Sequence, residues 1–89
     1  MKHFTLPRFW QYYQKLPRDI QELADKNYEL LKSDPNHPSL HFKKLGGKKQ
    51  LWSVRVGAHY RALGMEGSEG IVWFWIGTHA EYDRILATA

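Results

Sequence analysis

Apolar residues recur every three or four positions near the start of the chain, which is the spacing of an α-helix. Pro7 stands where the opening turn of such a helix would lie, and a proline is tolerated there because the first helical amides have no carbonyl partner. Thr5 is expected to cap this helix. Its apolar face would consist of Phe9, Trp10, Tyr13 and Leu16.

A second amphipathic pattern begins after Pro17, which interrupts the first helix. It predicts a helix from Arg18 to about Ser33, with acidic side chains near the N-terminus, where the helix dipole favours them. Two helices joined at a proline indicate a helical hairpin. The segment 34–39, DPNHPS, ends the second helix because each proline disfavours helix in the residue before it.

After this segment the apolar period shortens from about 3.6 residues to 2, which is typical of β-strands. Four strands are predicted, at Leu40–Leu45, Leu51–Val56, Tyr60–Met65 and Ile71–Ile76. Alternation within the second strand places Arg55 on the face opposite Trp52, Val54 and Val56. The last strand, IVWFWI, is apolar on both faces, which predicts a central strand that is covered on both sides.

The sequence THAE at positions 78–81 has the form of a capping box and predicts a C-terminal helix that runs to about Leu86. The order of elements is then helix, helix, three or four meandering strands, helix. This order predicts an α+β fold in which residues 1–89 form one domain.

The composition is that of a small globular protein without covalent cross-links. Hydrophobic residues make up 43% of the 89 positions and charged residues 25%, and there is no cysteine for a disulfide or a thiolate metal site. The longest apolar run, Ile71–Ile76, is far shorter than a membrane helix requires, and the N-terminus lacks the features of a signal peptide. We therefore expect a soluble, cytoplasmic protein with no membrane partner.

Positive charge is concentrated in one part of the chain. The formal net charge is +4, and the stretch from Pro35 to Met65 contains no acidic residue. Such a stretch indicates a surface that faces a polyanion, most simply a nucleic acid, although a solvated basic loop is the alternative. Its basic residues are Lys43, Lys44, Lys48, Lys49, Arg55 and Arg61, and His37, His41 and His59 lie in the same stretch.

A few of these residues could form a phosphate site. Arg55 and Arg61 should lie on neighbouring strands, and His79 follows the central strand at the start of the last helix. Guanidinium groups match phosphate oxygens, and an imidazole can transfer a proton near neutral pH. Each residue has an alternative account: Arg55 as an ordinary strand residue, Arg61 as an ion-pair partner of Glu22 or Glu29, and His79 as part of the helix cap.

Other residues have weaker claims to this site. Tyr82 lies one turn after His79, but core packing is at least as good an account of it as chemistry. Lys43 and Lys44 are adjacent, so on a strand at most one of them can face a single site.

Several other kinds of site are excluded. His37 and His41 are four residues apart, but Pro38 between them prevents the helical pairing that a zinc motif would need. No glycine-rich phosphate loop and no nucleophile elbow is present. An enzyme with this sequence would therefore use arginine and histidine, with tyrosine as a weaker candidate, and no metal or cofactor.

The ordered set of motifs resembles the RelE/ParE superfamily of bacterial type II toxins. The matching segments follow one another over nearly the whole chain: Leu16-Pro17, DPNHPSL at 34–40, FKKL at 42–45, WSVRVG at 52–57, YRAL at 60–63 and WIGTH at 75–79. The resemblance implies two N-terminal helices packed on one face of a small antiparallel sheet of three to four strands, a short C-terminal helix, and a basic concave face on the other side.

The resemblance also implies an activity and partners. RelE-like members cleave mRNA, usually on the ribosome and without metal, by driving a ribose 2′-hydroxyl onto the adjacent phosphate, and a cognate antitoxin holds them inactive. DNA would be reached only indirectly, through the toxin–antitoxin complex. ParE-like members share the fold but poison DNA gyrase instead, and a non-catalytic, protein-binding member of the fold is a third possibility.

Site residues are carried over by position. Arg55 and Arg61 match basic residues that hold the phosphate, His79 a candidate acid or base, and Tyr82 lies near an aromatic position used by some members. Two departures stand out: Ser53 is found where some nucleases of the family have a lysine, and only Lys2–Thr5 is available for the usual first strand. Residues expected to contact the RNA backbone are Lys43, Lys44, Lys48, Lys49 and His59.

Overall fold

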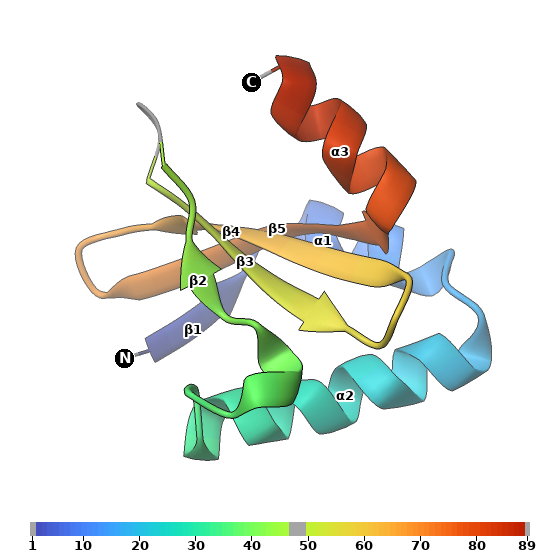
Figure 1. The fold of residues 1–89 in the computed structure, drawn as a ribbon, viewed down its shortest axis with the longest axis horizontal. Coiled ribbons are helices and arrows are strands. Elements are labelled where there is room, and N and C mark those ends of the chain that lie inside the picture. The colour runs from blue at the N-terminus through green and yellow to red at the C-terminus, as the bar shows by residue number, and fades with distance from the viewer. Residues whose placement is uncertain (1, 47–49, 89) are drawn as a thin grey trace.

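The computed structural model describes residues 2–46 and 50–88 (Figure 1). Its strands are β1 (Lys2–Thr5), β2 (Lys43–Lys44), β3 (Leu51–Val56), β4 (Tyr60–Glu66) and β5 (Gly70–Thr78). Its helices are α1 (Pro7–Gln14), α2 (Arg18–Ser33) and α3 (His79–Thr88), with a short 3₁₀ turn, η1, at Pro38–Leu40. The α+β fold is as predicted. Among the described residues, none of the helices has the length and apolar character needed to cross a bilayer.

The strands form one five-stranded sheet in the order β1-β5-β4-β3-β2. Its four meandering strands are antiparallel, as expected, but β1 adds a fifth strand that runs parallel to β5. The sequence predicted three or four strands because the four residues of β1 are mostly exposed and show no apolar alternation. The pairing of β1 with the segment that starts at Gly70 brings distant parts of the chain together, which local periodicity cannot reveal.

Helices cover both faces of the sheet. Figure 1 shows α2 on one side of the strands and α3 on the other. The larger core lies under α1 and α2 and includes Leu31, Val54, Val56, Trp73 and Ile76, and a smaller core lies under α3 and consists of Leu63, Trp75 and Tyr82. The prediction of a central strand covered on both sides is confirmed for β5.

A β-bulge allows β5 to serve both cores. The register passes from Leu63 opposite Trp75 to Gly64 opposite Trp73, which leaves Phe74 as the extra residue. A bulge turns the following side chains to the other face of the sheet. Trp73 and Trp75, two positions apart, therefore pack into different cores, whereas a regular strand would place them on one face.

The predicted strand Leu40–Leu45 is wrong over most of its length. Only Lys43–Lys44 pairs with β3, and Leu40 ends the turn η1 with its side chain fully buried. The His37 ring accepts a hydrogen bond from the Ser39 amide at the start of this turn, and His41 adopts a left-handed conformation at its end (φ 43°). The turn thus uses residues that the pattern had assigned to the strand.

Thr5 does not cap the first helix, contrary to the prediction. The N-cap position is held by Leu6 without a side-chain cap, and Thr5 ends strand β1. The Thr5 hydroxyl instead accepts a hydrogen bond from Trp10 Nε1 at 3.0 Å. The strand that precedes the helix, absent from the local pattern, accounts for this difference.

The capping box of α3 is confirmed. The Thr78 amide donates to Glu81 Oε1 at 3.0 Å, and the Glu81 amide donates to Thr78 Oγ1 at 3.2 Å. These two reciprocal bonds satisfy amides that the first turn of a helix leaves free. The hydrogen bond from the Thr78 amide, together with that from its hydroxyl, lowers the pKa of the Glu81 carboxyl below its usual value.

The contribution of Glu81 to stability is expected to depend on pH. A carboxyl whose pKa is lower in the folded state stabilises the fold above its unfolded pKa, and this stabilisation is lost as the pH falls through the folded pKa. The variant Glu81→Gln should therefore have a lower Tm than the wild type at about pH 7, and the difference should shrink as the pH falls through the lowered pKa of Glu81 in the folded protein. Thermal unfolding followed by circular dichroism checks this, and a difference that grows on acidification would contradict it.

Candidate functional site

Arg55 and Arg61 lie directly opposite each other on β3 and β4. Cross-strand partners point to the same face, so both guanidinium groups lie on the side of the sheet opposite Val54 and Val56. Both residues are half-buried, and among residues 2–46 and 50–88 neither forms an ion pair with a carboxylate. Like charges in this arrangement repel, so a bound anion would be stabilised here.

Backbone carbonyls orient the two arginines. Arg55 Nε donates to the Gly57 carbonyl at 2.9 Å, and Arg61 Nη1 donates to the Tyr60 carbonyl at 3.1 Å. Each guanidinium has five N–H donors, so most of its donors remain for a ligand. The pair is thus held in place without its charge being neutralised.

The alternative account of Arg61, an ion pair with an acid of α2, does not hold. Glu22 pairs with Arg18 at 3.7 Å, and Glu29 pairs with Lys32 at 3.0 Å. Helix α2 covers the opposite face of the sheet, so these acids cannot reach Arg61.

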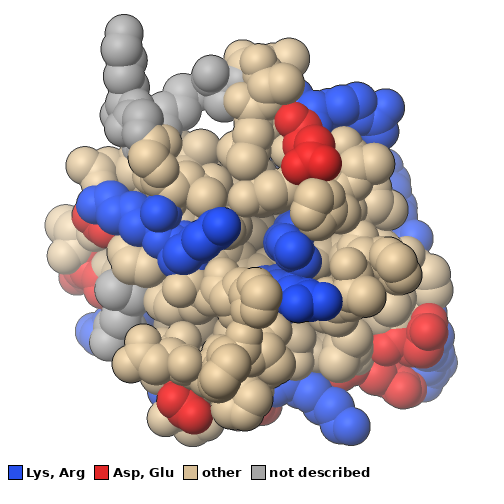
Figure 2. Space-filling view, in the orientation of Figure 1, with Lys and Arg blue, Asp and Glu red and all other residues tan. Residues whose placement is uncertain are grey.

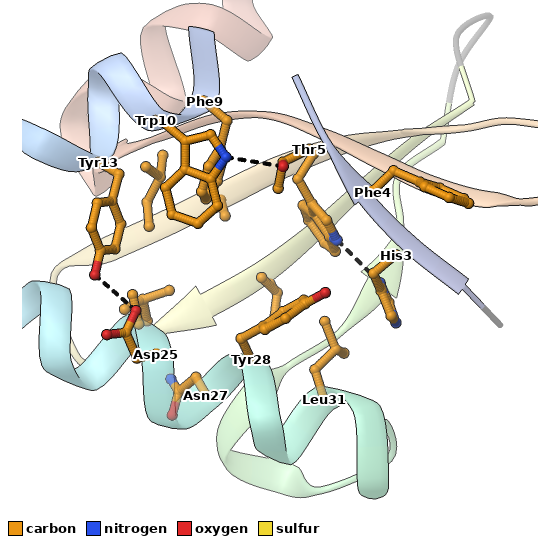
Figure 3. Close-up of a pocket in the computed structure, with 16 residues that line it drawn as sticks. His3, Phe4, Thr5, Phe9, Trp10, Tyr13, Asp25, Asn27, Tyr28 and Leu31 are labelled. Atoms are coloured by element: carbon orange, nitrogen blue, oxygen red, sulfur yellow. Dashed lines mark hydrogen bonds between the residues drawn. The ribbon is translucent and has the colours of Figure 1, made fainter. Parts of the chain in front are cut away.

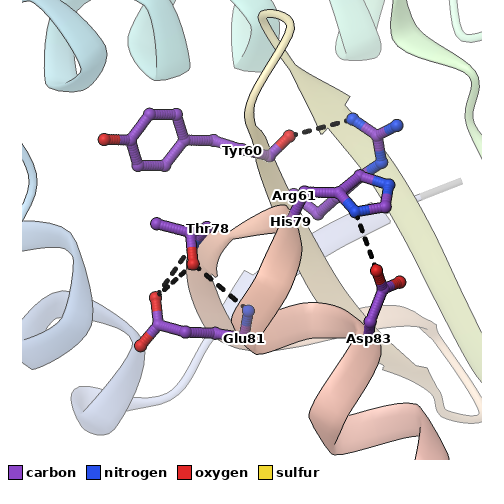
Figure 4. A network of polar contacts seen from close by, with 6 residues as sticks. All are labelled: Tyr60, Arg61, Thr78, His79, Glu81 and Asp83. Atoms are coloured by element: carbon purple, nitrogen blue, oxygen red, sulfur yellow. Dashed lines mark hydrogen bonds and ion pairs between the residues drawn. The ribbon is translucent and has the colours of Figure 1, made fainter.

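His79 lies at the same end of the sheet as the arginines. Its amide donates to the His59 carbonyl at 2.8 Å, which extends the ladder in which Arg61 faces Gly77. The imidazole Nδ1 lies 3.1 Å from Asp83 Oδ2, and the side chain is 46% exposed. Figure 4 shows Arg61, His79 and Asp83 grouped where β5 passes into α3.

Asp83 was not predicted from the sequence. It lies one helical turn after His79, at the i,i+4 spacing that brings side chains together on a helix. That spacing is the signal that could have identified it. A hydrogen bond that holds Nδ1 fixes the orientation of the ring and leaves Nε2 for a substrate.

Tyr82 packs in the core. It is 7% exposed and packs with Leu63 and Trp75 in the smaller core, with its ring centroid 5.7 Å from that of His79. The structure therefore favours the packing account of Tyr82, whose ring is also tilted against that of His79.

The two lysines of β2 separate as predicted. Lys43 pairs with Ser53, on the face of Arg55, whereas Lys44 pairs with Trp52 on the other face. Lys44 Nζ lies 3.4 Å from Glu66 Oε1, so its charge is partly balanced.

Of the other residues expected to contact RNA, the structure describes only one. His59 is exposed beside His79, and Lys48 and Lys49 lie outside the described residues. Figure 2 shows Lys and Arg side chains across the middle of the face viewed there, with acidic side chains toward its margins.

Comparisons with known proteins agree with this geometry. Residues 18–84 match the model of the ParE-like toxin domain family. No curated protein has a sequence that matches this chain.

Solved structures of toxins have a similar fold. A chain of the RelB–RelE antitoxin–toxin complex from Methanococcus jannaschii superposes with a TM-score of 0.70 at 19% identity, over 91% of this chain and 96% of that one. The YoeB/ParE toxin from Agrobacterium tumefaciens gives 0.66 at 21% identity, over 89% and 99%. The isolated RelE toxin from E. coli gives 0.63 at 14% identity, over 98% and 97%.

These structural likenesses concern the fold, whereas the family match concerns the sequence and spans three quarters of it. The order of motifs, the five-stranded sheet and the matched residues all agree. The chain belongs to the ParE-like toxin domain family, within the RelE/ParE superfamily of toxins.

Proposed function

We propose that this toxin is a metal-independent endoribonuclease that cleaves mRNA, with the ribosome as its place of action. The observation that carries the proposal is the cross-strand pair Arg55 and Arg61, whose side chains lie on the same face of the sheet without a counter-charge among the described residues, at the strand end that bears His79. A phosphate diester bound there would be held by two planar donors.

The reaction that suits these residues is attack of a ribose 2′-hydroxyl on the adjacent phosphate. The 2′-oxygen forms a bond to phosphorus while the bond to the 5′-oxygen breaks, which yields a 2′,3′-cyclic phosphate and a 5′-hydroxyl. One proton leaves the 2′-hydroxyl and one is added to the 5′-oxygen. In this proposal His79 would make one of these transfers, and the two arginines would stabilise the charge that develops on the phosphate oxygens.

We further propose that a cognate antitoxin controls the protein. The similar chain from Methanococcus jannaschii comes from a complex of an antitoxin with a toxin. Among the residues of this chain, Lys43 and His59 would contact the RNA backbone beside the arginine pair, and Tyr82 would support His79. Lys44, which Glu66 partly neutralises, would contribute less.

A gyrase-directed toxin without nuclease activity is the second candidate. The family model that matches is ParE-like, and Ser53, which is buried at 2% exposure, occupies the position where some nucleases of the superfamily have a lysine. A buried serine cannot supply a charge to the phosphate.

Induced expression in a bacterial host separates the two candidates. The nuclease proposal predicts growth arrest together with new internal 5′-ends in mRNA, mapped across transcripts after induction. Arrest with intact transcripts and a DNA-damage response would replace it with gyrase poisoning. Absence of arrest would leave a protein-binding role for the fold.

His79 and Asp83 are expected to act together in cleavage. Replacing His79 by alanine should lower the rate of RNA cleavage by about 100-fold, since general acid–base groups contribute that much or more. Asp83→Asn keeps the size of the side chain but removes its charge, and should lower the rate of cleavage by less than His79→Ala does, because Asp83 acts only through the orientation of the imidazole ring. Cleavage of a short RNA by the purified variants measures both, and Asp19→Asn, on the far side of the sheet, serves as the control. Equal losses in Asp83→Asn and Asp19→Asn would contradict the role of Asp83.

A further inference from the structure

A cavity of about 390 Å³ lies between α1 and α2, on the side of the sheet away from the arginine pair. Residues of the larger core form its floor, among them Val54, Val56 and Trp73, and Leu31 of α2 forms part of one wall. Figure 3 shows α1 with Phe9, Trp10 and Tyr13 on one side, α2 on the other, and β1 along a third. Its volume lies in the range of cavities that bind small molecules.

The aromatic side chains around this cavity are incompletely covered by the chain itself. None of the eight residues of α1, all of them described, is buried. Trp10 is 45% exposed, Phe4 40% and Tyr28 38%, and all three line the cavity. Protein interiors are normally packed without such gaps, and contiguous exposed apolar surface marks a place where something binds.

The polar groups of the walls are already satisfied within the protein. Trp10 Nε1 donates to Thr5, Trp73 Nε1 donates to the His3 ring at 3.1 Å, and the Asn27 amide donates to the Arg55 carbonyl at 3.2 Å. No buried side-chain nitrogen or oxygen lacks a partner in the described part of the chain. The cavity therefore favours an apolar body over a chain of water molecules.

Asp25 is the one fully charged residue among the described residues that line the cavity. Its Oδ1 accepts a hydrogen bond from the Tyr13 hydroxyl at 2.8 Å, and it forms no ion pair with a described residue. The faces of Trp and Tyr rings attract cations, and Lys32 Nζ already lies 4.7 Å from the centre of the Tyr28 ring. A second cation would be favoured at the Asp25 end, away from Lys32.

We propose that this cavity binds a small organic cation, with a planar aromatic ring inserted between α1 and α2 and a protonated amine at the Asp25 carboxylate. The apolar walls would favour a ligand with an aromatic ring, and the Asp25 carboxylate would favour a ligand with a positive charge. An aromatic acid of the same size would meet an uncompensated like charge. This site is separate from the arginine pair, and the proposal does not depend on what the toxin cleaves or poisons.

Two probes with the same ring and opposite charges test the proposal. Tryptamine and indole-3-acetate are each titrated into the ¹⁵N-labelled protein while the four tryptophan indole N–H signals are followed by NMR. Two of these tryptophans, Trp10 and Trp73, line the cavity, and two, Trp52 and Trp75, do not. Tryptamine should shift the first two signals saturably with a Kd of about 1 mM or tighter, and indole-3-acetate should bind at least about fivefold more weakly.

Matched variants assign the binding to this cavity and to its charge. Asp25→Asn keeps an oxygen for the Tyr13 hydroxyl, and should remove the preference for tryptamine while leaving the fold intact. Ala24→Trp fills the cavity from α2 and should abolish binding of both probes, whereas Ala87→Trp, on the exposed side of α3, should leave it unchanged.

Three results would overturn the proposal. They are absence of saturable shifts at Trp10 and Trp73, equal affinity for the two probes, and an unchanged preference in Asp25→Asn. Absence of saturable shifts would instead favour a cavity that accommodates an apolar side chain of a partner protein.

Discussion

Replacing Arg61 by alanine is expected to abolish growth arrest and to lower RNA cleavage by about 100-fold or more, because one donor to a developing oxyanion is typically worth that much. The melting temperature should stay within a few degrees of the wild type. Arg61 faces the like-charged Arg55, and among the described residues its side chain donates a hydrogen bond only to the adjacent Tyr60 carbonyl, so removing the side chain relieves repulsion and breaks one hydrogen bond. Growth curves, transcript 5′-end mapping and thermal unfolding of the same variant measure these quantities.

Arg18→Ala provides the matched control for this experiment. Arg18 is also an arginine, but it lies on α2 with its side chain 90% exposed and a weak contact to Glu22. Its loss should leave arrest and cleavage unchanged. An Arg61→Ala protein that unfolds would show that Arg61 is structural, and one that remains as toxic as Arg18→Ala would remove Arg61 from the site.

The largest loss of stability is expected from Gly64→Ala. The added Cβ would lie 2.4 Å from Ile71 Cγ2 and 2.9 Å from Trp73 Cε3, and both of these side chains are buried in the larger core. Overfilling of this kind typically costs about 1–3 kcal/mol of unfolding free energy, which lowers Tm by roughly 10 °C in a protein of this size. Gly64 also adjoins the bulge that turns Trp75 toward α3, so an added side chain there strains both cores.

Gly46→Ala is the control for Gly64→Ala, since a Cβ at that position would have no atom within 4 Å. Differential scanning calorimetry of the two variants should show a large decrease in Tm for Gly64→Ala and almost none for Gly46→Ala. Equal decreases would contradict the steric account and would mean that the core around Gly64 can accommodate a methyl group.

Local patterns were sufficient for the elements whose stability is local. Helix α2 runs from Arg18 to Ser33 as predicted, β3 occupies the predicted Leu51–Val56, and the capping box at Thr78 forms both of its bonds. In each case the residues that form the sequence pattern and the residues whose contacts stabilise the element lie within a few positions of each other. The placement of Arg55 and Arg61 on adjacent strands was likewise predicted, because a short turn leaves a hairpin few alternatives.

The site was predicted in part for the same reason. Arg61 was assigned to the strand after that of Arg55 and His79 to the position just past the central strand, and the antiparallel pairing of β4 with β5 brings these positions to one end of the sheet. The contact of His79 with Asp83 follows from helical spacing but was missed. Tyr82, which shares that helix, could be assigned to the core or to the site only once the position of α3 over Leu63 and Trp75 was known.

What the sequence by itself determined about this protein is most of its helices and strands, its basic stretch and its family, because these depend on periodicity and on motifs read along the chain. Only the tertiary structure decided the parallel pairing of β1 with β5, the bulge that sends Trp73 and Trp75 into different cores, and the cavity between α1 and α2. These features depend on contacts between segments far apart in sequence, where side-chain volumes and backbone hydrogen bonds must be satisfied together, and no local pattern records that balance.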